Sequence, residues 1–558
     1  MKFRIFLAVL AMTFVFQSCQ NQRRNESTED SPRIVNIINF IRQTEPRIER
    51  ITDEILYQTV VEQVKLLKEY QLKGTFLLQY DALINPRYQE LLKNELLDGS
   101  EIGGWWEITQ PHVEAAEIEW RGIYPWDWHA DVGFSPGYTP EEREKLVDVY
   151  MEKFKLIFGE YPSSVGSWFI DAYTLGYMYD KYGIKASCNC RDQIGTDGYT
   201  LWGGYWGQAY YPSRINAYMP AQTETGQIPV PIFRMLGSDP SYQYDHGVGQ
   251  GVSQSVTTLE PLCREAGGNP EWVKWFFNTM FDDPALGFTY VQAGQENSFT
   301  WDAMKDGLAI QIPLIAEQCK MNKIRVETLE ESGAWFKENF KVTPPTAISS
   351  LSDYRPQNRK TVWYNSRFYR TNILWEGSSF KIRDIHVFNE SVESDYYKNR
   401  LTSSQCYYTT LPIVDGNLWS NDNYLAGMKL YYVIGDGEWV EAKSSHSPLI
   451  TKGEDWLSVA WTLENDIATL TMLFSEDKTE ISCEANSKDF KWELNLTTAP
   501  NIDLPFTNLS EKEIDARLKN FDYQVKLDQG LLKDTRDSSS GSVFTLTPTG
   551  HKITIAYN

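Results

Sequence analysis

The chain contains few cysteines for its length, and this scarcity excludes a disulfide-based fold. Its 558 residues include seven cysteines, which are too sparse to form a disulfide scaffold. Six remain when Cys19 is set apart, and among these only Cys188 and Cys190 lie close together in sequence. No second cysteine pair and no neighbouring histidine completes a metal site around them, so we expect buried, apolar thiols.

The sequence also lacks an excess of positive charge and any block rich in lysine or arginine. Its formal net charge is −22, with a pI near 4.9. We therefore expect no nucleic acid or other polyanion as a partner. The acidic residues indicate a solvated surface that favours solubility. Beyond the N-terminus, no segment is apolar enough to span a bilayer.

The N-terminus predicts export from the cytoplasm. A short basic start precedes an apolar run of roughly a dozen residues, as in a secretory signal peptide covering residues 1–19. The run ends in FQSC, which resembles the lipobox of bacterial lipoproteins, and this resemblance implies that Cys19 is lipidated. The polar residues 20–32 then predict a flexible tether. We expect a bacterial cell-envelope protein, in the periplasm or on the outer-membrane surface, that contacts membrane only through this anchor. The alternative is an ordinary cleaved signal with an incidental cysteine.

Short apolar strands alternate with amphipathic helices through the first 340 residues. Residues 34–41 form a nearly continuous apolar run, as in a strand buried on both faces, and Thr52 begins the following helix. Residues 72–112 then follow the pattern strand, helix, strand. We count about seven such repeats, which predict an α/β fold with a parallel (β/α)7-type barrel over residues 33–342.

The second half of the chain has a different texture. The first half ends with a helix predicted over residues 260–282, followed by a further strand and helices. The sequence VTPPT at residues 342–346 is then typical of a domain boundary. Beyond it, short alternating segments such as KLYYVIG and WLSVAWTL are separated by turn signals. This pattern predicts a C-terminal all-β sandwich domain over residues 347–558.

The stretch LLKEYQLKGTFLLQYDALINPRYQELLKNELLDGSEIGGWW, which ends at Trp106, resembles the polysaccharide deacetylases. In that family a sequence motif of the type YG-K-TFF is followed by a helix and then by the motif GHEIG. Its relatives include the family 57 glycoside hydrolases, which share a seven-stranded (β/α) barrel. The segment SVGSWFIDAYTLGYMYDKYGIKAS at residues 164–187 resembles the family's later strand–helix–strand unit. The resemblance covers residues 34–340 and implies a carbohydrate-active barrel of the glycoside hydrolase/deacetylase superfamily.

The chain departs from the deacetylase pattern at the metal-binding positions. Deacetylases carry an Asp-Asp pair after the first strand, where this chain has NFIR at residues 39–42. They carry two histidines four residues apart after EIG, where this chain has WWEIT and then only His112. The metal triad cannot be mapped, and we expect no cofactor. A divalent metal is the open alternative, although Glu107, His112 and His129 would have no recognised ligand spacing.

Two carboxylates at predicted strand ends are the catalytic candidates. Glycoside hydrolysis needs one protonated and one ionised carboxyl group on opposite sides of the bond. Glu296 follows a strand, and burial beside Phe299 and Trp301 would raise its pKa. Asp171 follows an earlier strand. The resemblance to family 57 hydrolases implies that Asp171 is the nucleophile or base and Glu296 the acid. Alternatively, Asp171 caps a helix and Glu296 is a structural hydrogen-bond partner.

Aromatic and polar residues near the other strand ends predict a sugar pocket. Flat aromatic faces pack on the C–H faces of pyranose rings, while neighbouring polar groups bind the hydroxyls. The substrate-binding candidates are Glu45, Arg47, Trp105, Trp106, Glu107, His112, Trp126, Trp128, His129, Trp202, Trp206, His246, Gln295 and Asn297. The predicted stacking wall consists of Trp105, Trp126, Trp128, Trp202 and Trp206. For Glu45 the alternative is a buried ion pair with Arg47, and for any single histidine it is a structural role.

The leading hypothesis is a lipoprotein that hydrolyses a glycosidic bond in an oligosaccharide or polysaccharide. A metal-dependent polysaccharide deacetylase is the first alternative, and a non-catalytic glycan-binding lipoprotein on the same barrel is the second. No motif in the sequence specifies the sugar, the linkage or the oligomeric state.

Overall fold

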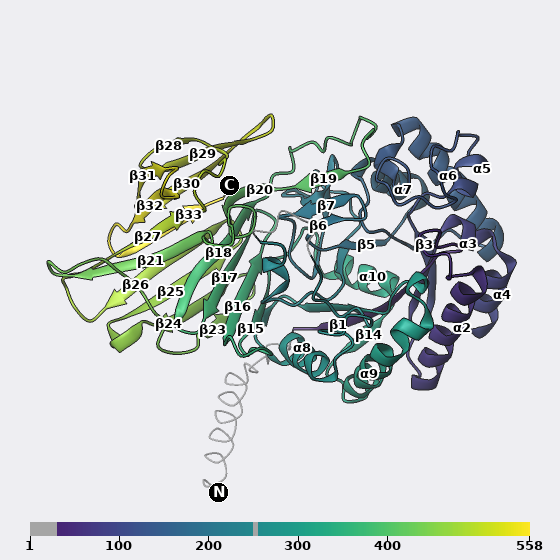
Figure 1. Ribbon diagram of the computed structural model, residues 1–558, viewed down its shortest axis with the longest axis horizontal. Coiled ribbons are helices and arrows are strands. Elements are labelled where there is room, and N and C mark those ends of the chain that lie inside the picture. Colours follow the sequence, from purple (N-terminus) through teal and green to yellow (C-terminus); the bar gives the residue numbers. More distant parts are fainter. Residues whose placement is uncertain (1–30, 249–254, 558) are drawn as a thin grey trace, which may run out of the picture.

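The computed structural model describes residues 31–248 and 255–557, and Figure 1 shows an α/β half packed beside a β half. The predicted signal peptide, the predicted lipidation site Cys19 and residues 20–30 of the predicted tether lie outside the described residues. Within the described part of the chain, no helix is both long and apolar enough to cross a membrane.

Parallel strands form the framework of the α/β half. They are β1 (Arg33–Ile41), β2 (Thr75–Leu78), β3 (Glu101–Trp105), β4 (Ser164–Gly166), β5 (Ala186–Cys190), β11 (Ile232–Met235), β13 (Thr289–Ala293) and β14 (Arg325–Glu327). Their order is β13–β1–β2–β3–β4–β5–β11, and β14 also pairs with β1. Short strands fill the long segment after β5: β6 (Gln193–Thr196), β7 (Tyr199–Trp202), β8 (Ala209–Tyr210), β9 (Pro212–Ser213) and β10 (Asn216–Pro220). Of these, β8 extends the sheet beyond β11 as an antiparallel edge.

The parallel sheet curls until β11 and β13 come into contact. Phe233 of β11 packs against Tyr290 of β13, with ring centroids 4.9 Å apart. The side chain of Gln292 accepts the backbone N–H of Leu236 at 2.9 Å. Among the described residues, however, no backbone ladder joins the two strands. The mixed α/β class is confirmed as a curled half-barrel, whereas a closed seven-fold barrel remains a prediction.

Helices pack around the curled sheet, and several begin and end at predicted signals (Figure 1). α2 (Asp53–Tyr70) starts after Thr52, whose side chain accepts a backbone N–H of the first turn. α6 (Pro140–Phe158) starts with a capping box formed by Thr139 and Glu142. The other helices are α3 (Tyr80–Ile84), α4 (Pro86–Glu95), α5 (Gln110–Ala115), α7 (Ala172–Tyr182), α8 (Pro270–Asp282), α9 (Trp301–Lys320) and α10 (Leu329–Asn339).

The helix predicted over residues 260–282 is shorter than expected. It begins only at Pro270, and the side chain of Asn269 accepts two N–H groups of the first turn. Proline suits the first helical position because its missing N–H would have no helical partner there. The preceding residues contain Gly267 and Gly268, which favour turns over helix. The correct start was therefore encoded in the sequence by a cap and a proline.

Antiparallel sheets make up the β half. Its strands are β15 (Thr346–Ser350), β16 (Arg359–Asn365), β17 (Tyr369–Glu376), β18 (Ser379–Val387), β19 (Cys406–Thr409), β20 (Leu411–Asp415), β21 (Gly427–Ile434), β22 (Val440–Glu441), β23 (Leu449–Lys452), β24 (Leu457–Thr462), β25 (Ala468–Ser475), β26 (Lys478–Ala485), β27 (Phe490–Thr497), β28 (Phe506–Leu509), β29 (Glu513–Leu518), β30 (Phe521–Gln529), β31 (Leu531–Asp537), β32 (Ser542–Thr547) and β33 (Lys552–Ala556). One sheet runs β15–β16–β17–β18–β21–β27–β32–β31, and a second runs β23–β24–β25–β26–β33–β30–β29–β28. Trp375 and Trp461 join the two sheets with ring centroids 5.0 Å apart. The all-β composition is confirmed, and the specific sandwich architecture remains a prediction.

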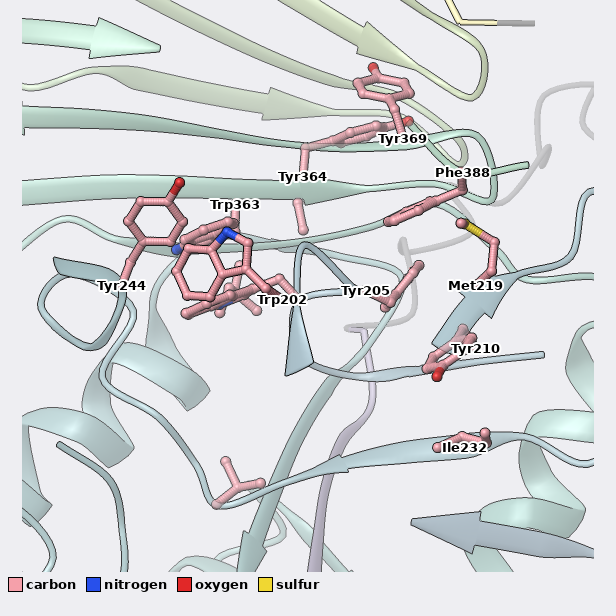
Figure 2. Packing of buried hydrophobic residues seen from close by; sticks show 14 of the residues in the cluster. Trp202, Tyr205, Tyr210, Met219, Ile232, Tyr244, Trp363, Tyr364, Tyr369 and Phe388 are labelled. Carbon is pink, nitrogen blue, oxygen red and sulfur yellow. The ribbon is translucent and has the colours of Figure 1, made fainter. Parts of the chain in front are cut away.

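Strand pairs cross the predicted boundary between the halves. β12 (Ala285–Leu286) precedes that boundary but pairs with β15, and β19 runs parallel to β7 of the α/β half. Trp206 stacks on Trp363 across the junction, with ring centroids 3.9 Å apart and an interplanar angle of 4°. Figure 2 shows the surrounding aromatic packing, which includes Trp202, Tyr205, Tyr244, Trp363, Tyr364 and Phe388. The two halves therefore share one aromatic core, and their division at residues 342–347 stays a prediction.

Candidate functional site

Polar side chains follow four strands of the curled sheet at the point where each strand ends. Arg42 follows β1, Gln79 follows β2, Glu107 lies two residues after β3, and Glu296 follows β13 at the start of η3 (Asn297–Phe299). The carboxyl ends of parallel strands lie at the same edge of a sheet, which is where α/β proteins place their ligands. Four residues that are distant in sequence therefore converge.

Arg42 is the centre of this group. Its Nη2 and Nε donate to the two carboxylate oxygens of Glu107 at 2.7 and 3.0 Å, and its Nη1 lies 3.0 Å from Glu296 Oε2. Gln79 Nε2 donates to Glu107, and Ser298 Oγ donates to Glu296 Oε1 at 2.7 Å. One guanidinium thus holds two carboxyl groups beside each other. We call Arg42, Gln79, Glu107, Glu296 and Ser298 the Arg42 cluster.

The charged members of the Arg42 cluster are almost completely shielded from water. Arg42 and Glu107 each expose 1% of their surface, and Glu296 exposes 2%. Burial, aided by the nearby charge of Glu107, raises the pKa of Glu296 to about 7 against the opposing charge of Arg42. Glu107 accepts three charge-assisted or amide hydrogen bonds, an arrangement that stabilises an ionised carboxylate. The cluster can therefore hold one protonated and one ionised carboxyl group near neutral pH.

An aromatic side chain and a second ion pair cover Arg42. The guanidinium carbon of Arg42 lies 4.0 Å from the Trp126 ring centroid, and that of Arg47 lies 4.7 Å from Trp126. Cation–π attraction thus joins the tryptophan to both arginines. Arg47 donates to the two oxygens of Glu45 at 2.8 and 2.7 Å and reaches Asp197 Oδ1 at 3.2 Å. The predicted Glu45–Arg47 ion pair is present, and it forms the outer layer of the site.

An open groove lies beside the Arg42 cluster, between α2 and η3. It has a volume of about 810 Å³, which falls within the range of about 300–1,000 Å³ common for small-molecule sites. Ser298, which donates to Glu296, also lines this groove, and Phe299 and Trp301 give it an aromatic side. On the α2 side, the groove is lined by polar residues that include Glu62. Ser298 is therefore the member of the Arg42 cluster that lines the groove.

Asp171, the second predicted catalytic carboxylate, lies apart from the Arg42 cluster. It is fully buried at the N-cap of α7 and accepts the N–H and the hydroxyl of Thr174 at 3.0 and 2.6 Å. Ser135 Oγ and Arg143 Nη1 donate to it at 2.5 and 3.0 Å. Among the described residues, no hydrogen bond or ion pair links Asp171 to Glu296. Four donors occupy its oxygens, so the geometry supports the capping role that the sequence left as the alternative.

The structure places a different carboxyl group beside Glu296 than the predicted Asp171, and the catalytic roles of both predicted residues stay predictions. The carboxyl group that it brings to Glu296 belongs to Glu107, which the sequence placed among the substrate-binding residues. Arg42, Gln79 and Ser298 were not among the predicted site residues. For Arg42 and Gln79 the sequence signal was a polar residue directly after a buried apolar strand, and for Ser298 it was a position two residues after the catalytic candidate. That signal becomes specific only when the order of strands in the sheet is known.

The predicted tryptophan wall is dispersed through the molecule. Trp105 packs within the curled sheet, 4.1 Å from the ring of Phe40, and Trp206 lies in the aromatic junction between the halves. Trp126 and Trp128 do lie at the Arg42 cluster, where Arg47 contacts both rings. The structure therefore does not bring the five candidates together, because the sequence does not separate tryptophans that pack in the core from those near the site.

Two predicted binding residues are core residues behind β3. His112 stacks on Tyr80 with ring centroids 4.6 Å apart, and its edge packs against Trp106. His112 Nε2 lies 2.8 Å from the carbonyl oxygen of Leu146, to which it donates as a neutral ring. Burial lowers the pKa of His112 to about 4. Trp106 and His112 are therefore packing residues, which corrects their predicted substrate-binding role.

The other predicted histidines occupy two different places. His129 lies beside Trp128, with its Nδ1 2.6 Å from Asp127 Oδ1, near the outer layer of the site. His246 bonds to Thr257 and Ser255 instead. Glu107, His112 and His129 are consequently not brought together as a ligand set. Among residues 31–248 and 255–557, no group of three His, Cys, Asp or Glu side chains is placed to hold a metal ion.

Gln295 and Asn297 shape the turn after β13 through bonds within the protein. Gln295 Oε1 accepts the N–H of Glu296 at 2.8 Å, and its Nε2 donates to Glu260 at 2.7 Å. Asn297 Oδ1 accepts the N–H of Arg42 at 2.9 Å, and its Nδ2 donates to the carbonyl of Arg42 at 2.8 Å. Both side chains are held by bonds within the protein, and their predicted binding of sugar hydroxyls stays a prediction.

No protein-family model matches this chain, and neither does any curated protein. Solved structures similar to it include a Parabacteroides distasonis protein described as a glycoside hydrolase/deacetylase, at 15% identity over 68% of this chain and 91% of that one, with a TM-score of 0.49. The 4-alpha-glucanotransferase of Thermococcus litoralis is similar at 10% identity over 94% of this chain and 99% of that one, with a TM-score of 0.30. A family 4 acetyl xylan esterase of Clostridium thermocellum is similar at 10% identity over 54% of this chain and 91% of that one, with a TM-score of 0.25. All three are at most 15% identical to this chain, with TM-scores below 0.5.

Proposed function

We propose that this protein is a carbohydrate-active hydrolase that cleaves a glycosidic bond, with Glu296 as the proton donor and Glu107 as its ionised partner. The observation that carries the proposal is the contact of both carboxyl groups with the guanidinium of Arg42. Glycosidases combine a protonated and an ionised carboxyl group, and environments that push two pKa values apart define the two roles. A pKa of about 7 for Glu296 suits a general acid that works near neutral pH.

The reaction then follows from the two protonation states. The carboxylic O–H of Glu296 gives its proton to the glycosidic oxygen as the bond from that oxygen to the anomeric carbon breaks. The positive charge that develops on the sugar faces the ionised Glu107. Water adds its oxygen to the anomeric carbon and returns one proton to Glu296. Arg42 is a positioning residue, since it contacts both carboxyl groups and fixes their separation.

The groove supports a carbohydrate as the substrate. Phe299 and Trp301 offer aromatic surface for the C–H face of a sugar ring, while Gln58 and Glu62 from α2 offer groups for its hydroxyls. Substrate in this groove reaches the Glu296 side of the cluster past Ser298. The opposite side is covered by Trp126 and Arg47, which exclude water from the two carboxyl groups.

The test is a product assay on the purified chain with a panel of oligosaccharides and acetylated polysaccharides. New reducing ends are the expected product, and Glu296→Gln lowers their rate of formation by about 100-fold or more. Glu260→Gln is the matched control, because Glu260 is half-buried, also has a raised pKa and bonds to the same turn, yet does not contact Arg42. Release of acetate that depends on a divalent metal, without reducing ends, would establish the deacetylase instead.

A non-catalytic glycan-binding protein is the second candidate. The observation that favours it is the near-complete burial of Glu107 and Glu296 under Trp126 and Arg47. That candidate predicts saturable glycan binding with neither reducing ends nor acetate after long incubation. It also predicts that Glu296→Gln leaves the glycan affinity unchanged.

A further inference from the structure

A second pocket lies where β19 borders the tip of the hairpin formed by β29 and β30, and it shares no lining residue with the Arg42 cluster or its groove. Its volume is about 390 Å³, within the range of about 300–1,000 Å³ for small-molecule sites. Asn216 of β10 and the segment 391–395 complete its lining. We call it the Tyr407 pocket. It joins segments of both halves, and Figure 1 shows β19 between them.

Strand β19 contributes an aromatic ring and a hydroxyl to the Tyr407 pocket. Successive residues of a strand point to opposite faces, and the burial of β19 alternates accordingly. Cys406 and Tyr408 pack into the core, whereas Tyr407 is 52% exposed and Thr409 is half-buried. The hydroxyl of Thr409 makes no hydrogen bond with another described residue. Both outward side chains of β19 are therefore available to a ligand.

Asn216 contributes a buried amide with one unused donor. Only 5% of its surface is exposed, and its Oδ1 accepts the backbone N–H of Tyr218 at 3.1 Å. Its Nδ2 has no hydrogen-bond partner among the described residues, although buried polar groups normally have one. Nδ2 is also not sealed from solvent. A ligand hydroxyl in the pocket would give this amide the partner that it lacks.

The hairpin beside β19 is held in place without a ligand. Leu518 pairs with Phe521, so a two-residue turn joins β29 and β30. Lys519 in this turn has a φ of +53°, as such tight turns require. The same lysine forms an ion pair with Asp395 of the segment 391–395. Because this ion pair links two sides of the lining, the pocket is preformed.

The charged groups of the Tyr407 pocket already have partners. Lys519 binds Asp395, and Glu393 lies 2.6 Å from Lys398 Nζ. Among the described residues that line the pocket, no cation is left without a carboxylate. An anionic ligand would therefore lack a counter-charge. The free amide, hydroxyl and aromatic ring suit a neutral ligand that is polar at its edge and apolar on its face, as a sugar ring is.

We propose that the Tyr407 pocket binds one ring of a neutral sugar. The ring of Tyr407 packs on the C–H face of the sugar, while Asn216 Nδ2 donates to one hydroxyl and Thr409 Oγ1 bonds to another. The groups that bind the sugar are thus those that no other part of the described chain occupies. The proposal does not depend on hydrolysis at the Arg42 cluster.

The same chemistry could come from a free sugar or from one unit of a glycan. The probes are therefore the methyl α- and β-glycosides of glucose, galactose, mannose and xylose, together with the matching linear oligosaccharides. Calorimetric titration of the full chain carrying Glu296→Gln avoids turnover during the measurement. We expect at least one methyl glycoside to bind at millimolar concentrations. Equal affinity for the oligosaccharide supports a free sugar, and higher affinity supports a glycan.

Three variants connect this binding to the pocket. Tyr407→Ala removes the exposed ring, and we expect it to weaken binding by about tenfold or more. Tyr424→Ala is the matched control, because Tyr424 is 51% exposed and lies outside the pocket. Thr409→Val removes only the hydroxyl and keeps the branched shape that suits a strand, so it should weaken binding in a chain that melts like the parent.

The methyl glycoside of glucuronic acid should bind more weakly than that of glucose, since the pocket has no unpaired cation. Absence of binding by all neutral glycosides would overturn the proposal. Affinity that stays unchanged in folded Tyr407→Ala would place the sugar at another site and would also overturn it. A preference for the glucuronic acid glycoside would contradict the neutral character of the site.

Discussion

Arg42 stacks on Trp126, with its guanidinium carbon 4.0 Å from the ring centroid, while the edge of the same guanidinium contacts Glu107 and Glu296. The aromatic face thus takes the place of water on one side of the charge. This arrangement explains how an arginine that exposes 1% of its surface remains charged. Burial alone would lower its pKa, but the charges of the two glutamates outweigh burial and raise the pKa of Arg42.

Removal of Arg42 should destabilise the whole fold. Arg42→Met leaves Glu107 buried with only Gln79 as a side-chain donor, and loss of one partner of a buried ion pair costs roughly 3–5 kcal/mol. Urea denaturation followed by tryptophan fluorescence measures the change. Arg87→Met is the matched control, because its pair with Glu54 is exposed at the surface and screened by water, so its removal should cost far less stability. Equal losses in the two variants would contradict the buried-pair interpretation.

The stability of the protein should depend on pH through Glu296. Its pKa in the folded protein is about 7 and its ordinary value is 4.5, so the folded state holds this proton more tightly than the unfolded state. The stabilisation is complete below pH 4.5 and is lost as the pH rises through 7. Glu296→Gln should remove this part of the slope. The measurement is the free energy of unfolding at intervals from pH 4 to 8, and an identical slope in the variant would count against the raised pKa.

Asp171 should matter for folding rather than for chemistry. Asp171→Asn weakens the cap of α7 and its buried bond to Arg143, so we expect a lower melting temperature. The turnover of the variant that remains folded should stay within a few-fold of the parent. Thr52→Ala is the control for a cap without a buried ion pair, with an expected cost of about 1 kcal/mol. A loss of turnover in folded Asp171→Asn comparable to that of Glu296→Gln would restore Asp171 as a catalytic residue.

Gly203 should tolerate no larger residue. It has a φ of +80°, and a Cβ there would lie 2.3 Å from both His386 Nδ1 and Thr410 Oγ1. Gly203→Ala therefore combines backbone strain with a steric clash, and we expect it to lower the melting temperature. Gly183→Ala is the matched control, with a similar φ of +72° and no neighbouring atom within 4 Å. It should show the backbone strain alone, and an equal drop in melting temperature in the two variants would contradict the prediction.

Local order was predictable from the sequence where one element carries its own signals. The starts of α2 and α6 follow Thr52 and Thr139, because a capping side chain needs only residues within one helical turn. The continuous apolar run of β1 likewise reveals a strand with both faces covered. Glu296 was singled out from the sequence because it lies three residues after a strand and between two amide side chains, and its catalytic role stays a prediction.

The partners within the site were not predictable, because they depend on which strands become neighbours. Arg42 and Glu107 are separated by 65 residues in the chain. They meet only because β1, β2 and β3 are neighbours in the sheet. Asp171 has the same local pattern as Glu296, a carboxylate after a strand, yet donors from Ser135 and Arg143 close around it. Trp105 is buried and Trp128 is half-buried for the same reason, since only the tertiary structure decides which indole ring reaches the surface.

The most direct test of the central claim is the pH dependence of kcat on the best glycan in the product panel. We predict an alkaline limb near pH 7, where Glu296 loses its proton. We also predict that Glu260→Gln keeps this limb and that Glu296→Gln lowers kcat by about 100-fold or more at every pH. Hydrolysis by Glu296→Gln at the parental rate, with the alkaline limb unchanged, would contradict the assignment of Glu296 as the acid.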